Sequence, residues 1–285
     1  MRFLVFGSRG FIGKNLVKRI QAEGHFVTSL DIEDIDVRFS LDWIDTTFNL
    51  KDYDYIYYLT AISDISACNS DVINAFSTNV SGLIYLLEQL KENKPVGSYY
   101  LPLFIFSSSV YVYNNDSGIY GITKRTAEAI IKWYGKNRGL DYRILRYGSV
   151  YGSGSNKNNA IYRMIKEAIE TGIISYYGTG EEVREYIHVK DVVKNSLEIL
   201  DSKYKNKTLT ISGHFPMKAK DMCYMLKEIL GSEYAINFKC ETPSGHYITT
   251  PYSYMPDISE KYISKTYYDL GSGLLDLIKE IKGEG

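Results

Sequence analysis

The sequence predicts an α/β protein built on a doubly wound parallel sheet, with a smaller discontinuous domain formed by C-terminal segments. Two observations carry this prediction. Short apolar strand segments alternate with amphipathic helical segments through residues 1–150, which is the pattern of a parallel sheet covered by helices on both faces. The first strand segment also ends at a glycine-rich turn that leads into the first helix, as in folds that bind ligands at the carboxyl edge of the sheet.

The expected strands are short apolar runs, several of which end at a glycine, an acidic residue or serines. They are residues 2–6, 26–30, 55–61, 103–106 and 142–145. The expected helices carry apolar residues at a period near 3.6. The first begins at Phe11 and stops at Gly24, and the others span residues 71–92 and 120–138.

The pattern changes after Tyr151. A polar loop over residues 152–159 precedes a helix at 160–170 and a glycine-punctuated stretch at 178–180. We therefore assign residues 1–150 to the sheet domain, with 189–211 returning to it. Residues 151–188 and 212–285 are assigned to a smaller cap.

Composition excludes several classes of protein. The 285 residues carry 33 Lys plus Arg against 34 Asp plus Glu, so they lack the basic excess that nucleic-acid binders use. The three cysteines are widely spaced, which indicates neither a disulfide framework nor a zinc site. The apolar runs are far shorter than a membrane span. We expect a cytoplasmic protein with no metal, no membrane partner and no nucleic-acid partner.

Gly7, Gly10 and Gly13 form a GxxGxxG turn between the first strand and the first helix. The first glycine allows a tight turn, the second lets backbone N–H groups approach a diphosphate, and the third lets the helix pack on the strand. Asp31 closes the second strand, where a carboxylate binds ribose hydroxyls and repels a 2′-phosphate. The pattern predicts a Rossmann-type NAD site. A glycine set that serves packing alone is the alternative reading, and Arg9, which suits a 2′-phosphate, is the one feature against NAD.

Tyr120 and Lys124 form a YxxxK pair, and this spacing puts both side chains on one helix face. Ser109 follows a strand and therefore lies at the same edge of the sheet. The set suits hydride transfer at an alcohol carbon, because a phenolate can remove the hydroxyl proton while the serine holds the same oxygen. We expect Lys124 and a cationic nicotinamide to lower the pKa of Tyr120 by about three units from its usual value near 10. A surface helix that happens to carry both residues is the alternative.

Together these motifs resemble the extended short-chain dehydrogenase/reductases of the nucleotide-sugar epimerase/dehydratase group. The resemblance runs nearly from end to end. Beyond the glycine turn and the YxxxK pair, it rests on Leu59-Thr60-Ala61, Asn79-Val80-Ser81-Gly82, Val150-Tyr151-Gly152 and the stretch from Gly178 to Val192. That last stretch is similar to the pattern GxGxxxRDFIHVxDV.

The resemblance implies a set of site residues. Ser109, Tyr120 and Lys124 would be catalytic, and Arg184 would bind the diphosphate of a nucleotide sugar, a task that suits a guanidinium. Ser109 and Ser149 complete the implied substrate site. The implied cofactor-binding residues are Gly7, Gly10, Phe11, Ile12, Gly13, Asp31, Asp36, Val37, Leu59, Thr60, Ala61, Asn79, Ser107, Tyr120, Lys124 and Tyr147. The family also implies a homodimer formed through the helices that contain Asn79 and Tyr120.

The chain departs from the family at four places. Val110 and Tyr111 stand where 4,6-dehydratases carry an acidic pair, so the acid–base chemistry of dehydration is not expected. Only ten residues separate Ser109 from Tyr120, which predicts a more open site or closure by another segment. Ser149 replaces an asparagine, and residues 249–254 show no match to a downstream arginine. The identity of the nucleotide therefore stays open.

The implied activity is NAD-dependent oxidation of a sugar hydroxyl at C4 of a nucleotide sugar, with an epimerase ranked first. A nucleotide-sugar C4 dehydrogenase and a 4-keto reductase share the same half-reaction and stay open, as does a non-catalytic NAD(H)-binding regulator. We further expect His188 to pack or to cap structure, Glu128 to support the helix of Tyr120, and Cys68 to be an inert thiol.

Overall fold

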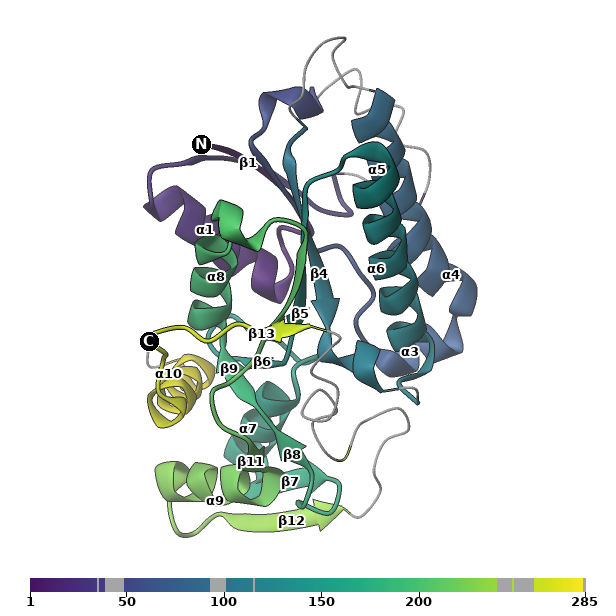
Figure 1. Cartoon of the computed structure of the whole chain (residues 1–285). Helices are drawn as coiled ribbons and strands as arrows, with labels where there is room; N and C mark the ends of the chain where they lie inside the picture. Colours follow the sequence, from purple (N-terminus) through teal and green to yellow (C-terminus); the bar gives the residue numbers. More distant parts are fainter. Residues whose placement is uncertain are drawn as a thin grey trace.

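The structure, a computed structural model, describes residues 1–34, 36–38, 49–92, 101–114, 116–239, 248 and 259–283. Within these ranges, a seven-stranded parallel sheet with the order β13-β10-β5-β4-β3-β1-β2 forms the centre of the protein (Figure 1). Its strands are β1 (Arg2–Phe6), β2 (Phe26–Leu30), β3 (Tyr55–Tyr58), β4 (Leu103–Ser109), β5 (Tyr142–Tyr147), β10 (Lys207–Ile211) and β13 (Glu260–Lys261). The doubly wound sheet predicted from the sequence is confirmed.

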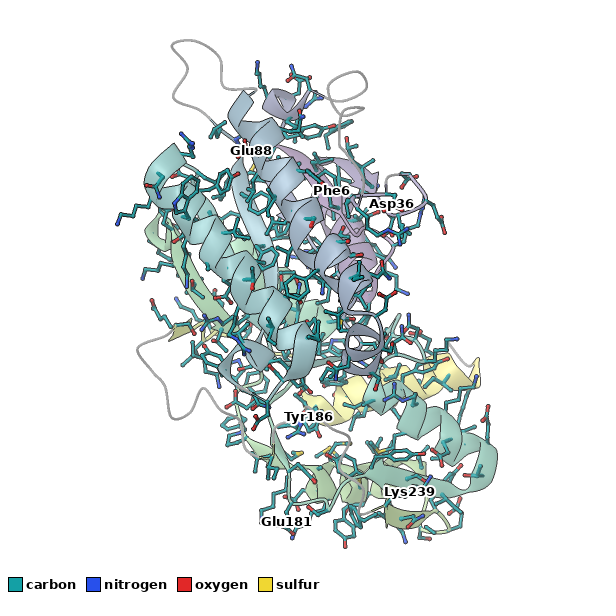
Figure 2. All side chains as sticks on the ribbon, turned by 90° about the vertical axis from the view of Figure 1, so that its right-hand side faces the viewer. Phe6, Asp36, Glu88, Glu181, Tyr186 and Lys239 are labelled. Carbon is teal, nitrogen blue, oxygen red and sulfur yellow. The ribbon has the colours of Figure 1, made fainter. Side chains whose placement is uncertain are left out.

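Helices cover both faces of this sheet. The helices α1 (Phe11–Ala22) and α8 (Val189–Glu198) lie on one face, and α5 (Gly82–Glu92) and α6 (Gly118–Arg138) lie on the other (Figure 1). Figure 2 looks onto the second face, where α5 and α6 run side by side in front of the strand that carries Phe6. Further short elements on this side are η1 (Leu50–Asp52), α3 (Ile65–Ser70), α4 (Val72–Phe76), η2 (Ser77–Ser81) and η3 (Val110–Tyr113).

The apolar side chains explain why the strands stay central. All six residues of β5 are buried, as are the last four of β1, which is typical of strands packed on both faces. Phe6, Tyr58 and Phe106 pack against α5 and α6. Leu16 and Val192 contribute to the core on the opposite face. The sheet therefore holds its carboxyl edge rigidly, and that edge carries the candidate site.

A smaller lobe follows the sheet domain and has its own core. Its elements are β6 (Ser149–Tyr151), α7 (Ala160–Thr171), β7 (Ile173–Tyr177), β8 (Val183–Arg184), β9 (Tyr186–His188), β11 (Met217–Lys218), α9 (Ala219–Leu230), β12 (Ala235–Lys239) and α10 (Leu270–Lys282). The 3₁₀ turn η4 (Ser202–Tyr204) leads into β10. Met164, Met222 and Leu274 join α7, α9 and α10 in one apolar cluster.

The strands β4 and β5 extend beyond the expected 103–106 and 142–145, to Ser109 and Tyr147. The structure also differs from the expected elements in three further places. The helix expected over residues 71–92 is divided into α4, a π-helical turn η2 and α5. The strand expected to reach residue 61 ends at Tyr58, and residues 59–61 continue without regular secondary structure. Residues 260–261 add the edge strand β13 beside β10, a return to the sheet that the sequence did not predict.

Two structural findings concern the wider classes considered above. Among the described residues, no helix combines the length and apolar character needed to cross a membrane. The same ranges hold no group of three or more His, Cys, Asp or Glu side chains arranged to bind a metal ion.

Candidate active site

The glycine turn forms a close-packed cradle at the end of β1. Gly7 has φ +78°, and a Cβ there would lie 2.8 Å from the Thr60 backbone nitrogen. A Cβ at Gly13 would lie 2.0 Å from the Gly7 carbonyl oxygen, so larger residues cannot replace either glycine without moving the backbone. Gly10 directly precedes α1 and brings no side chain to the N–H groups of its first turn. A helix N-terminus presented in this way suits a diphosphate, and Phe11 and Ile12 in that turn pack against the core beneath it.

The end of β2 is strongly acidic. The Asp31 carboxylate accepts the Arg9 and Ile32 backbone N–H groups at 2.7 and 2.8 Å. The guanidinium of Arg9 pairs with Glu33 at 2.5 Å and with Asp34 at 3.0 Å. Arg9, the residue that favoured a 2′-phosphate in the sequence, is thus drawn toward carboxylates. A phosphate on the 2′ oxygen would meet Asp31 in the middle of this acidic group, whereas a free ribose could donate hydrogen bonds to it.

Two further predicted cofactor residues lie against the start of α5. Asp36 forms an ion pair with Arg38, and this hydrogen bond lowers the pKa of Asp36 below its usual value. Arg38 also donates to the Asn74 side chain at 3.1 Å. Val37 is buried, and a Cβ at Gly82 would lie 2.8 Å from its side chain. The small residue at Gly82 is therefore required where the segment from Asp36 crosses the helix.

Asn79 fastens the segment that follows β3. Its side-chain oxygen accepts the Ile62 N–H at 2.8 Å, while its amide group donates to the Ile62 carbonyl at 3.1 Å and to the Thr123 hydroxyl at 3.1 Å. The π-helical turn that contains Asn79 aims it at both partners, and such turns are frequent at functional sites. Asn79 therefore holds residues 59–62 against the helix of Tyr120, and its polar atoms are engaged within the protein.

The predicted catalytic set comes together at the end of β4. Ser109 is the last residue of β4, and its hydroxyl hydrogen-bonds to Tyr120 on α6. The ammonium of Lys124 donates to the Ser107 carbonyl at 2.8 Å and lies 5.9 Å from the centre of the Tyr120 ring. All three side chains are at least nine-tenths buried. The geometry matches a proton-transferring tyrosine with a serine and a lysine beside it.

Burial dominates the electrostatics of this set. Burial raises the pKa of Tyr120 to about 12, although the hydrogen bond from Ser109 opposes the rise. Burial also lowers the pKa of Lys124 to about 8, against the opposing fields of Cys68 and Glu128. Desolvation penalises the charged forms of both side chains. The expected lowering of the Tyr120 pKa by Lys124 together with a cationic nicotinamide stays a prediction for the cofactor-bound protein.

A buried ion pair supports the catalytic set from behind. The Glu128 carboxylate on α6 accepts the Arg146 guanidinium at 2.8 and 2.6 Å and the Ser108 hydroxyl at 2.6 Å. Arg146 in turn lies over the Tyr113 ring, 4.6 Å from its centre. One carboxylate thus ties α6 to the end of β4, next to Ser109. This arrangement confirms that Glu128 supports the helix of Tyr120.

The short connection before Tyr120 is held by hydrogen bonds within itself and to α6. The Ser117 hydroxyl donates to the Asn114 carbonyl at 2.6 Å, and Arg125 on α6 donates to the Val112 and Asn114 carbonyls at 3.3 and 3.0 Å. The first turn of α6 is capped from α3, where the Asn69 side chain accepts the Ile119 N–H at 2.9 Å. These bonds fix the connection itself. Whether the sugar site is more open or is closed by another segment, the two expectations from the ten-residue spacing, stays a prediction.

Tyr147 and His188 make contacts within the protein core. The Tyr147 ring is buried on the α8 side of the sheet, and its hydroxyl bonds to Ser196 at 2.8 Å, so the structure does not bring this side chain into the site. His188 begins α8, and its Nδ1 accepts the Lys190 N–H at 3.3 Å. Burial and the nearby Lys190 lower the pKa of His188 to about 4, which confirms its expected capping and packing role.

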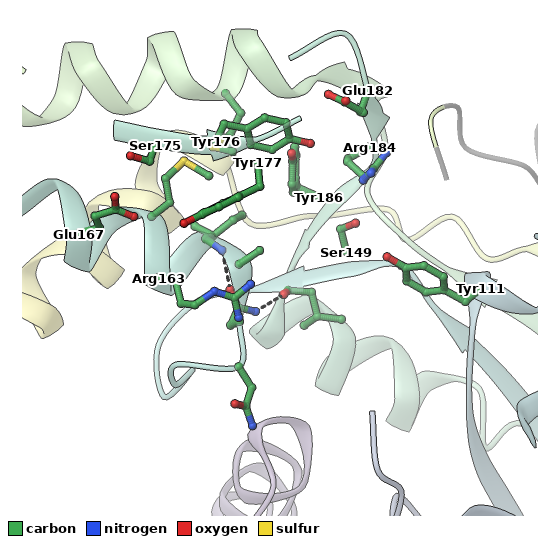
Figure 3. A pocket seen from close by; sticks show the side chains of 18 residues that line it. Tyr111, Ser149, Arg163, Glu167, Ser175, Tyr176, Tyr177, Glu182, Arg184 and Tyr186 are labelled. Atoms are coloured by element: carbon green, nitrogen blue, oxygen red, sulfur yellow. Dashed lines mark hydrogen bonds between the residues drawn. The ribbon is translucent and has the colours of Figure 1, made fainter. Parts of the chain in front are cut away.

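A cavity of about 580 Å³ extends from the catalytic end of the sheet into the smaller lobe. The predicted substrate residues Ser149 and Arg184 both line it, as does Tyr111. Figure 3 shows Tyr111, Ser149 and Arg184 on one side of this cavity. Sequence reasoning missed the lining residues of the other side, among them Arg163, Glu167, Ser175, Tyr176 and Tyr177. They share no local motif, and only their position before the glycines at 178 and 180 hinted at a role.

Arg184 is buried beside polar groups of this cavity. Its guanidinium donates to the Val183 carbonyl at 3.0 Å and to the Ile248 carbonyl at 3.5 Å. Glu182 accepts N–H groups of Thr179 and Gly180, both at 2.8 Å, and these bonds keep its pKa below the usual value although burial opposes them. The cavity therefore holds a fixed cation next to a fixed anion. The residues 249–254 considered in the sequence lie outside the described residues.

Comparison with known proteins identifies relatives of this chain. A profile of the NAD dependent epimerase/dehydratase family matches residues 3–212. An uncharacterized UDP-glucose epimerase of Bacillus subtilis is 23% identical, with 84% of this chain and 85% of the relative covered. A UDP-glucose 4-epimerase of Lactobacillus helveticus is 27% identical, with 73% and 74% covered.

Solved structures share the fold. A UDP-glucuronic acid 4-epimerase of Bacillus cereus, in complex with UDP-glucuronic acid and NAD, superposes with a TM-score of 0.83 at 23% identity and covers 99% of both chains. A UDP-glucose 4-epimerase of Thermotoga maritima, with UDP-glucose, gives a TM-score of 0.82 at 22% identity, again over 99% of both chains.

Proposed function

Because the chain belongs to the NAD dependent epimerase/dehydratase family, we propose that it is an NAD-dependent nucleotide-sugar 4-epimerase. The observation that carries the proposal is the meeting of three features at one edge of the sheet. The glycine cradle, the Ser109–Tyr120–Lys124 set and the cavity that contains Arg184 all lie there. Each of these parts is needed to bring a nucleotide sugar to a nicotinamide cofactor.

The residues at the cradle fit NAD. The backbone N–H groups after Gly10 would hold the diphosphate, where the spacing of Gly7 and Gly13 leaves room for a close approach. Asp31 would accept hydrogen bonds from ribose hydroxyls, and the carboxylates of Glu33 and Asp34 near it disfavour a 2′-phosphate. When bound, NAD supplies a hydride acceptor and a positive charge that favours the phenolate of Tyr120.

The protein side of the reaction is proton transfer. Tyr120 takes the proton of the sugar hydroxyl as the adjacent carbon is oxidised, and it returns the proton when the carbon is reduced again. The one proton of the Ser109 hydroxyl, donated to Tyr120 in the protein alone, would be donated to the substrate oxygen when the sugar binds and would stabilise its developing charge. Lys124 donates to the Ser107 carbonyl, which fixes its ammonium under the phenol.

Two neighbours of Ser109 argue against one reaction of the family. Val110 and Tyr111 provide no carboxylate for elimination of water, which argues against a dehydratase although the family contains such enzymes. A C4 dehydrogenase or a 4-keto reductase shares the first half-reaction with an epimerase. Arg184 would hold the diphosphate in each of these reactions, so the substrate class is the same.

The test is mass spectrometry coupled to chromatography, on UDP-, GDP-, dTDP- and CDP-sugars incubated with protein and NAD. A product of equal mass and shifted retention supports the epimerase. A product lighter by two hydrogens replaces it with a dehydrogenase, and one lighter by water replaces it with a dehydratase. Absence of any product, with NAD bound, overturns the epimerase and favours the 4-keto reductase or the regulator.

We also propose a homodimer. Large apolar side chains are exposed along α4, α5 and α6, among them Ile73, Tyr85, Ile122 and Trp133, with Ile73 81% exposed. Ile122 and Trp133 are eleven positions apart, which places them on the same face of α6. Light scattering should give a molar mass twice that of one chain, and Trp133→Glu should lower the measured mass toward that of a single chain.

We also propose a cytoplasmic location. The free thiols Cys68 and Cys223 agree with it.

A further inference from the structure

Glu182 is a buried carboxylate at the wall of the cavity, directly before the strand that carries Arg184. It is 2% exposed and lines the cavity. Its Oε1 accepts the Thr179 N–H at 2.8 Å and the Thr179 hydroxyl at 3.1 Å, while its Oε2 accepts the Gly180 N–H at 2.8 Å. Both oxygens are therefore engaged by the turn that joins β7 to β8.

This turn is shaped around the carboxylate. Gly178 has φ +150°, and a Cβ there would lie 2.6 Å from the Glu182 Oε1. Gly180 has φ +84°, a conformation that favours glycine. The Gly178 N–H also donates to the Lys239 carbonyl at 2.9 Å, which ties the turn to the end of β12. The two glycines therefore leave the space into which Glu182 folds back.

Glu182 also connects two walls of the cavity. Tyr176 on β7 lines one wall, and Arg184 on β8 lines the other. Burial raises the pKa of the Tyr176 phenol to about 12, Arg184 opposes the rise, and Glu182, to which the phenol hydrogen-bonds, adds to it. Figure 3 shows Glu182 next to Arg184, with Tyr176 across from them. One carboxylate thus links the Tyr176 phenol, the turn and the start of β8.

These bonds decide how Glu182 can act on a ligand. A carboxylate has about four acceptor positions, and donors from Thr179, Gly180 and Tyr176 occupy as many. Its carbonyl oxygen accepts the Ala219 N–H at 2.8 Å, which docks the first residue of α9 against it. Glu182 therefore influences a bound molecule through the residues that it holds in place.

We infer that Glu182 is a positioning residue for nucleotide binding, which fixes the spacing between the Tyr176 wall and Arg184 so that Arg184 meets the diphosphate. The inference deepens the proposed function and rests on it, because Arg184 is the diphosphate ligand only in that proposal. Without the carboxylate, the Thr179 and Gly180 N–H groups lose their acceptor, and buried donors without a partner are costly. The turn would then rearrange and displace the start of β8. The catalytic set lies on β4 and α6 and would keep its geometry.

The test is calorimetric titration of Glu182→Gln with UDP, GDP, dTDP and CDP in the presence of NAD. The Kd of the diphosphate that the wild type binds best should rise at least about tenfold, while the affinity for NAD stays within about twofold. In turnover, KM should rise by a similar factor and kcat should stay within about threefold, a division that general destabilisation would not produce.

Glu181→Gln is the matched control. It makes the same change at the adjacent residue, whose carboxylate is 52% exposed and pairs with Lys218 and Lys220 at 2.7 and 2.5 Å. Exposed pairs contribute little, so the Kd of the diphosphate should stay within about twofold. An equal Kd in wild type and Glu182→Gln, or tighter binding by Glu182→Gln, would overturn the inference while leaving the proposed function intact. If the wild type binds none of the four diphosphates, the proposed function fails and the inference fails with it.

A double-mutant cycle shows whether Glu182 acts through Arg184. In an Arg184→Met background, Glu182→Gln should change the Kd of the diphosphate by less than about twofold, because the residue that it positions is gone. The same tenfold effect in both backgrounds would overturn the inference. Thr179→Val removes the hydroxyl that donates to Glu182 and keeps the branched shape, so it should raise the Kd about threefold. If circular dichroism shows that Glu182→Gln does not fold, Thr179→Val decides, and an unchanged Kd in that variant would overturn the inference.

Discussion

Replacing Glu128 with alanine is expected to destabilise the protein and to slow its reaction. The change removes one carboxylate that accepts two hydrogen bonds from Arg146 and one from Ser108. Arg146 is 3% exposed, so its guanidinium would stay buried without this partner. Loss of one partner of a buried ion pair costs about 3–5 kcal/mol, and the stranded Ser108 hydroxyl adds about 1 kcal/mol. We therefore expect Glu128→Ala to lower the free energy of unfolding by an amount near the upper end of that range.

The assay is urea unfolding followed by circular dichroism, with the Glu128→Gln, Arg146→Met double variant as the matched control. The double variant removes both charges and should lose less stability than Glu128→Ala, since no unpaired charge remains. The kcat of Glu128→Ala should fall more than its KM rises, because Glu128 sits beside Lys124 and Ser109 without lining the cavity. A loss below about 1 kcal/mol, or a double variant less stable than the single one, would refute this reasoning.

Three further perturbations test other parts of the structure. Asp31→Asn should raise the affinity for NADP relative to NAD by about tenfold in fluorescence titration, and an unchanged ratio would remove Asp31 from cofactor selection. The folded state keeps His188 neutral down to about pH 4 while the unfolded chain protonates near 6.5, so stability should fall by up to about 3 kcal/mol as pH drops through this window. His188→Asn should lose most of this dependence in urea unfolding at pH 7 and 4.5, and an unchanged dependence would place the titrating group elsewhere. Asn69→Ala should lower kcat about fivefold by removing a cap worth about 1 kcal/mol, whereas Asn69→Asp should retain activity. Equal kcat in both Asn69 variants would show that the cap does not position Tyr120.

The parallel sheet was accessible from the sequence because its signals are local. Strand segments such as 2–6 and 26–30 are apolar and end at a glycine or an aspartate, and both bounds agree with the structure. The break between α4 and α5 could not be predicted from local sequence signals. The π-helical turn at Ser77–Ser81 depends on the approach of Asn79 to Ile62 and of Gly82 to Val37, and such contacts lie far apart in sequence.

The candidate site also combines features that local sequence predicts with features that depend on contacts between distant residues. The spacing of Tyr120 and Lys124 and the strand end at Ser109 sufficed to predict that these side chains meet. The direction of the Tyr147 ring, toward Ser196 on α8, depends on which face of β5 it occupies and was not foreseen. The burial that raises the pKa of Tyr120 was not predicted either, because a spacing gives the neighbouring charge but not the degree of burial.

The residues on the far side of the cavity show most clearly why part of the site could not be predicted from the sequence. Arg163 and Glu167 come from α7, and Tyr177 comes from β7. Their side chains share one cavity only because the smaller lobe folds them against the sheet domain. A motif that depends on neighbours in sequence has no means of grouping them.

The most direct test of the central claim is the turnover of Tyr120→Phe. The substitution removes the phenol hydroxyl and keeps the ring that packs beside Lys124 and Tyr111. NAD affinity, measured by titration, should stay within a few fold of wild type, while turnover of the best nucleotide sugar should fall by about 10²–10⁴-fold. Full activity in this variant would contradict the assignment of Tyr120 as the group that transfers the proton.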